Sequence, residues 1–78
     1  MESKDIIIAL TALAQSSRLA VFRLLVQSGE EGMPAGKIAE ALDIPSSSLS
    51  FHLKELNYAG LIKPRQEGRF VIYSANYE

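Results

Sequence analysis

A run of hydroxyl side chains beside the chain's single histidine is the segment best equipped for chemistry. It reads SSSLSFHL from residue 46 to residue 53. On a helix, Ser48 would lie one turn before His52, which is the spacing of a hydroxyl nucleophile next to a base. Such a pair also needs an orienting carboxylate and a substrate pocket, and the sequence shows neither. A helical metal pair is excluded because residues 48 and 56 are Ser and Leu. We therefore predict no catalytic residue, no metal ligand, no cofactor and no enzymatic activity.

The same segment has the periodicity of a helix, which a flexible serine linker lacks. At about 100° per residue, one face collects apolar side chains and the histidine. This stripe consists of Leu49, His52, Leu53 and Leu56. We expect it to be buried, with His52 as a hydrogen-bonded core residue. The opposite face carries Ser47, Ser50, Phe51, Lys54 and Tyr58.

The face opposite the stripe suits contact with another molecule. A solvent-facing helix usually carries Lys and Glu, whereas this one begins with short hydroxyls and continues with Phe51 and Tyr58. A serine hydroxyl can hydrogen-bond to bases and phosphates, and an aromatic edge can contact a thymine methyl group. The alternative is a polar helix start with two ordinary surface aromatics. The neighbouring elements distinguish these two interpretations.

Periodicity and breaker residues predict four helices followed by a hairpin. The helices cover about residues 3–13, a stretch that begins at Ser16 or Ser17 as N-cap and ends in QSGEEGMPAG, residues 35–42, and residues 46–59. The first helix is expected to bury Ile6, Leu10 and Leu13. The second is expected to bury Leu19, Phe22, Leu25 and Val26, and the third Ile38, Ala41 and Leu42. Residues 61–66 and 69–75 read as strands around Glu67-Gly68, and Pro64 confines the first of them to an edge.

A short helix, the turn DIP and a longer helix have the spacing of a helix-turn-helix at residues 35–59, and the hairpin at residues 61–75 adds a wing. In that motif the second helix enters the DNA major groove. Arg65 and Arg69 flank the expected wing tip, where they would reach a phosphate or the minor groove. The predicted fold is therefore α+β, mainly α, a winged helix-turn-helix forming one domain over residues 1–78.

The first helix has apolar residues around most of its girth. Ile7 and Ile8 fall off the face that carries Ile6 and Leu10. Such a helix needs cover on more than one side, either from its own core or from a second subunit. We expect Ile7 and Ile8 to form the interface of a homodimer.

Composition limits the remaining classes. The 78 residues contain no cysteine, so neither a disulfide nor a thiolate metal site is available. No apolar run approaches the roughly 20 residues of a membrane span, and MESKDIIIAL does not resemble a secretory signal. We expect a cytoplasmic protein with no membrane contact. A net charge of −1 means that binding to double-stranded DNA would depend on individual side chains. A winged-helix module that binds protein stays open as the alternative.

Three segments carry a resemblance to a known family: LTALAQSSRLAVFRLL, GKIAEALDIPSSSLSFHLKELNYAGLI and RQEGRFVIYSA. Together they are similar to the ArsR-type (ArsR/SmtB) repressors, and LSFHLKEL looks most like an arsenic-responsive subgroup. The resemblance implies a homodimeric winged-helix repressor that binds a palindromic operator and is released by an inducer. It places DNA contacts at Ser46, Ser47, Ser50, Phe51 and Lys54.

The sequence departs from this family at several sites. Position 46 is commonly Gln in the family and position 51 is often Arg or His, so Ser46 and Phe51 imply a different sequence preference. A family metal site uses Cys-x-Cys where this chain has Pro34 and Gly36. Further family sites follow the wing and would lie past residue 78. The inducer is therefore unknown, and a metalloid is expected only if a longer protein supplies cysteines there.

Overall fold

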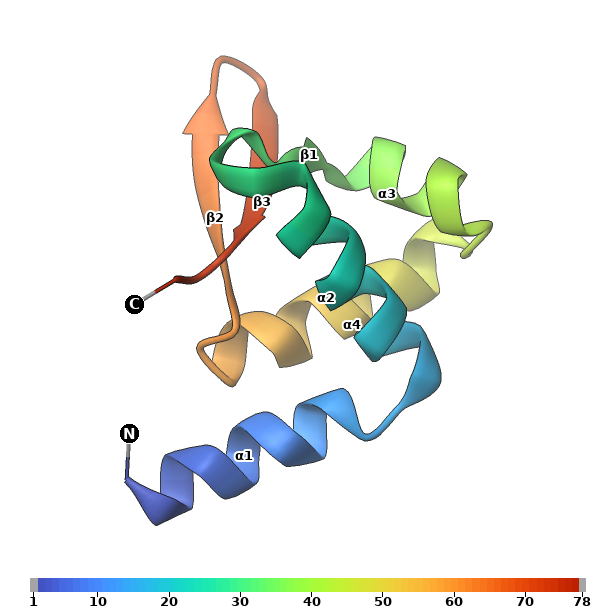
Figure 1. Cartoon of the computed structure of the whole chain (residues 1–78). Helices are drawn as coiled ribbons and strands as arrows, with labels where there is room; N and C mark the ends of the chain where they lie inside the picture. Colours follow the sequence, from blue (N-terminus) through green and yellow to red (C-terminus); the bar gives the residue numbers. More distant parts are fainter. Residues whose placement is uncertain (1, 78) are drawn as a thin grey trace.

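The computed structural model describes residues 2–77, which form four α-helices and a three-stranded antiparallel sheet. Along the chain they are α1 (Ser3–Leu13), α2 (Ser16–Ser28), the 3-10 turn η1 (Gly29–Glu31), β1 (Met33–Pro34), α3 (Ala35–Leu42), α4 (Ser46–Tyr58), β2 (Ile62–Glu67) and β3 (Phe70–Ala75). α4 crosses the middle of the molecule, with α1 on one side and α2, α3 and the sheet on the other (Figure 1). The predicted winged helix-turn-helix fold is confirmed.

The core forms where α2, α3 and the start of β2 meet the apolar face of α4. Its fully buried large side chains are Val21, Leu25, Ile38, Leu49, Leu56 and Ile62, and Leu53 is almost as deep. Burying a leucine or isoleucine in this way stabilises the fold by roughly 1.5–3 kcal/mol. The three leucines of the predicted α4 stripe are therefore confirmed as core residues. His52, expected among them, is only half-buried, because it lies at the rim where α2 meets α4.

The packing face of α1 differs from the expected one. Ala9 and Ala12 are buried and Ile8 is half-buried against the core, whereas Ile7 and Leu10 are 63% and 62% exposed. Small alanines let α1 approach its neighbours closely, so the larger side chains on its other sides point outward. The expected stripe of Ile6 and Leu10 was wrong.

Smaller corrections apply to α2 and α3. In α2 the buried residues are Val21 and Leu25, while Leu19 and Val26 are exposed. Gln15 occupies the N-cap position instead of a serine, and its side chain accepts a hydrogen bond from the backbone N–H of Arg18. In α3, Ile38 is buried but Ala41 is exposed. Within residues 2–77 no single helix is long and apolar enough to cross a membrane; one pair, Ser3–Leu13 with Ser16–Glu31, qualifies only when joined and is bent by 103°.

Two turns place α4 as the sequence indicated. Asp43 ends α3 in the left-handed conformation, with φ 53° and ψ 47°. A short polar side chain tolerates this conformation better than a bulky one does. Pro45 is the residue before α4, and no serine side chain caps that helix. At the other end, Gly60 has φ +77° and turns the chain from α4 into β2.

The sheet has the order β1-β3-β2, so the wing contains a third strand that the sequence did not suggest. Met33 and Pro34 pair with Tyr73 and Ile72 of β3. Pro64 lies on the edge strand β2, as predicted. Glu67 pairs with Phe70, so the two connecting residues are Gly68 and Arg69 and the expected Glu67-Gly68 turn is shifted by one residue.

Candidate nucleic-acid interface

The outer face of α4 presents the residues that the sequence singled out. Ser46, Ser47, Ser50 and Lys54 are all exposed on it. Phe51 is 52% exposed and Tyr58 is 79% exposed, although both are large aromatic side chains. The Ser50 hydroxyl donates to the backbone carbonyl of Ser46 at 3.0 Å, which leaves its own oxygen free to accept. α4 therefore has a buried leucine face and an outer face of small hydroxyls and aromatic rings.

Phe51 and His52 are joined to α2 by Arg18. The Nε–H of Arg18 donates to Nδ1 of His52 at 3.3 Å, and the guanidinium carbon lies 5.4 Å from the centre of the Phe51 ring. The two rings are themselves 6.1 Å apart and tilted by 58°. Partial burial, followed by the positive charge of Arg18, lowers the pKa of His52 below its ordinary value of 6.5. His52 therefore favours the neutral form, whose Nδ1 accepts the hydrogen bond from Arg18.

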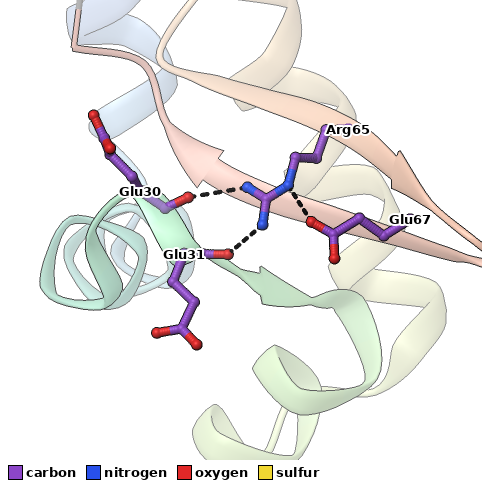
Figure 2. A network of polar contacts seen from close by, with 4 residues as sticks. All are labelled: Glu30, Glu31, Arg65 and Glu67. Carbon is purple, nitrogen blue, oxygen red and sulfur yellow. Dashed lines mark hydrogen bonds and ion pairs between the residues drawn. The ribbon is translucent and has the colours of Figure 1, made fainter.

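Arg65 is tied to the body of the protein, as Figure 2 shows. Its Nε donates to the Glu67 carboxylate at 2.5 Å, and its two terminal nitrogens donate to the backbone carbonyls of Glu30 and Glu31 at 3.0 and 2.8 Å. These bonds connect β2 of the wing to η1, which lies more than 30 residues earlier in the chain. The guanidinium predicted to contact nucleic acid is therefore engaged mainly within the protein.

Arg69 has a different setting. It occupies the second position of the two-residue connection between β2 and β3 and is exposed. Gly68 precedes it with φ +61°. A positive φ at the first residue of a two-residue hairpin loop is typical of a tight turn that matches the twist of the strands. Neither a hydrogen bond nor an ion pair within residues 2–77 involves the Arg69 side chain.

A hollow of about 250 Å³ lies between α1 and the last turn of α4. Its lining includes Ile7, Ile8 and Tyr58 together with two charged residues, Arg18 and Glu55. Because Ile7 and Tyr58 are also among the most exposed large hydrophobic side chains, the part of this surface that they form is apolar and accessible. Ile8 turns inward against the core, so Ile7 is the outward member of the predicted interface pair.

Sequence reasoning did not single out Arg18, which lies 34 residues before His52. Nothing in helical periodicity connects residues so far apart. Phe70, 58% exposed beside the wing turn, was also missed as a surface aromatic. Among residues 2–77, no three side chains of His, Asp or Glu are grouped so as to hold a metal ion.

Comparison with known proteins agrees with this geometry. A family described as a helix-turn-helix domain matches residues 13–65. The chain is 40% identical over 58 residues to the uncharacterized HTH-type transcriptional regulator YceK of Bacillus subtilis, covering 74% of this chain and 57% of that protein. It is 37% identical to the transcriptional repressor SdpR of Bacillus subtilis, covering 83% of this chain and 69% of that one. The chain thus spans little more than half of YceK.

A solved structure extends the likeness to three dimensions. The homodimeric winged helix-turn-helix DNA-binding domain of Mb0332 from Mycobacterium bovis, a possible ArsR-family transcriptional regulator, superposes with a TM-score of 0.85 at 29% identity. The match covers 94% of this chain and 65% of that one. These relatives are transcription regulators and not enzymes. With its helix-turn-helix, its three-stranded wing and these similarities, the chain belongs to the ArsR family of winged helix-turn-helix transcriptional regulators.

Proposed function

We propose that this chain is a sequence-specific repressor that binds a palindromic DNA operator as a homodimer. The observation that carries the proposal is the division of α4 into two faces. Leu49, Leu53 and Leu56 hold one face in the core, and the other presents serines and a half-exposed Phe51. The second helix of a helix-turn-helix reads the major groove with its N-terminal residues, which is where these side chains lie.

The proposed contacts divide into readers and anchors. Ser46, Ser47, Ser50 and Phe51 would contact base edges and nearby phosphates, and Phe51 suits the methyl group of thymine. Lys54, exposed on the same face, would bind a phosphate. Arg69 would do so from the wing. Arg65 contributes by holding the wing in place, and its two remaining N–H groups would be its only means of reaching DNA directly.

The proposed dimer interface is the exposed apolar surface of α1, centred on Ile7, with Ile8 beneath it. The second copy would cover the part of the adjoining hollow that Ile7 and Tyr58 line, and would leave Arg18, which also lines it, accessible. A two-fold dimer places its two reading helices about one turn of DNA apart, roughly 34 Å. Sedimentation of the chain would test this part, with Ile7→Lys expected to shift the population to monomer because it places a charge in the interface.

Release by an inducer is the remaining part of the proposal. Pro34 and Gly36, at β1 and the start of α3, offer no metal-binding side chain. A metalloid inducer would need thiolates, and these 78 residues contain none. We therefore expect DNA binding by this chain on its own to be insensitive to arsenite.

Selection of tight binders from a random duplex library, followed by titration at increasing salt, tests the proposal. The selection should recover a two-fold symmetric sequence. The logarithm of the binding constant for that sequence should fall linearly with the logarithm of salt concentration, because counterions are released. Lys54→Ala should weaken all duplexes about equally and lower the slope of the dimer by about two, one for each half-site. The absence of binding to any duplex at low salt would favour the alternative of a protein-binding winged helix, with which the net charge of −1 also agrees.

A further inference from the structure

Arg18 is a partly buried cation whose orientation is fixed from two sides. Its Nε–H donates a hydrogen bond to Nδ1 of His52, and its guanidinium lies over the ring of Phe51. Both partners belong to α4, whereas Arg18 belongs to the first turn of α2. The planar guanidinium is therefore held beside Phe51, at the edge of the outer face of α4.

The terminal nitrogens of Arg18 remain available. A guanidinium has five N–H donors, and within residues 2–77 only the Nε–H of Arg18 meets an acceptor. Arg18 and Glu55 both line the hollow beside α1, yet no carboxylate of the described residues forms an ion pair with Arg18. Within residues 2–77 the four terminal N–H groups thus have neither an acceptor nor a carboxylate, in contrast to Arg65, which uses all three of its nitrogens.

The stability of α2 does not explain a cation at this position. A positive charge in the first turn of a helix is unfavourable, because the helix dipole places partial positive charge there. A role in binding an anion would explain it, since the anion would neutralise a cation that lies near the positive end of the helix dipole. A guanidinium held in one orientation also loses little side-chain entropy when it binds.

We propose that Arg18 is a DNA contact, whose guanidinium binds a backbone phosphate next to the base that Phe51 touches. His52 is the positioning residue that orients the guanidinium, and Arg18 in turn fixes the ring of Phe51. The inference rests on the proposed DNA-binding function and adds to it a residue from α2, outside the helix-turn-helix and the wing. An arginine fork matches the geometry of a phosphate, which a lysine meets only as a point charge.

The test is the salt dependence of binding to the selected duplex for Arg18→Gln and Arg18→Lys. Glutamine keeps an N–H that can reach His52 but loses the charge. The slope for the dimer should therefore fall by about 1.8, because one phosphate contact is lost in each half-site. Lysine keeps the charge and loses the fork, so the slope should stay and the affinity should fall several-fold. Arg23→Ala, at an exposed position on the same helix, is the matched control and should change neither quantity.

The outcomes separate this inference from the proposed function. If the wild-type chain binds no duplex, the proposed function fails first. If the wild-type chain binds and folded Arg18→Gln keeps the full slope, Arg18 only joins α2 to α4 and the inference is overturned. Loss of the folded circular-dichroism spectrum in both Arg18 variants would overturn it as well, because the residue would then be part of the scaffold.

Discussion

The root of the wing and the outer face of α4 are built in opposite ways. At the wing root, Arg65 meets two backbone carbonyls and a carboxylate, and Gly32 lies against the backbone of β3. On the outer face of α4, the Lys54 side chain forms neither a hydrogen bond nor an ion pair within residues 2–77, and Phe51 stays half-exposed although it contacts Arg18 and His52. The polar groups of the wing root form hydrogen bonds that fix its position, whereas the outer face of α4 leaves polar groups accessible to a ligand. Side chains at the wing root therefore shape the surface, whereas those on the outer face of α4 would contact DNA.

The largest expected effect comes from Gly32, which adopts φ +70° and ψ −167°, a conformation almost confined to glycine. A Cβ there would lie 2.4 Å from the carbonyl oxygen of Tyr73. Gly32→Ala should lower the free energy of unfolding by about 3 kcal/mol or more, since left-handed strain and a backbone clash add. Gly36→Ala is the control: no atom lies within 4 Å of its Cβ, and alanine in α3 should stabilise by about 0.5–1 kcal/mol. Urea denaturation measures both, and equal effects would contradict the described wing root.

The outer face of α4 should respond to substitution in binding and not in folding. Phe51→Ala should leave the unfolding midpoint nearly unchanged and alter base preference at one position per half-site, with about 1–3 kcal/mol of discrimination lost. Leu53→Ala, two residues away on the buried face, should cost about 2 kcal/mol or more in stability. Repeating the duplex selection and the denaturation for both variants checks the contrast. Unfolding of Phe51→Ala would show that the ring belongs to the core.

The two wing arginines should also behave differently. Arg69→Ala removes an exposed, unengaged cation from each subunit and should lower the salt slope of the dimer by about 1.8 with no change in stability. Arg65→Ala should leave the slope nearly unchanged, cost about 1 kcal/mol in stability and weaken binding, because the wing is released from η1. Fluorescence titrations at several salt concentrations measure both. A lower slope for Arg65→Ala would restore Arg65 as a direct contact.

Features set by local sequence signals could be predicted from the sequence, whereas features that depend on tertiary packing could not. The fold and the facing of α4 were predictable, because three leucines at helical spacing and the glycine and proline breakers are local signals. The packing face of α1 was not, since buried Ala9 and Ala12 carry a weaker hydrophobic signal than exposed Ile7 and Leu10. β1 has only two residues, and its pairing with β3 spans about half of the chain. The bond from Arg18 to His52 and the ties of Arg65 likewise depend on tertiary packing.

His52, at the junction of α2 and α4, gives the smallest expected effect. Its pKa is lowered in the folded state, so as the pH falls below 6.5 the unfolded chain takes up a proton before the folded chain does. The free energy of unfolding should therefore be greatest above pH 6.5 and should decrease as the pH falls from there to the pKa of His52 in the folded protein. Protonated Nδ1 also cannot accept the hydrogen bond from Arg18. His52→Gln keeps an acceptor without titrating, and all carboxylates are common to both proteins. As the pH is lowered from about 7.5 to about 5, the urea midpoint should therefore fall more for the wild type than for His52→Gln. Parallel pH profiles of the two proteins would show that protonation of His52 does not affect the stability of the junction.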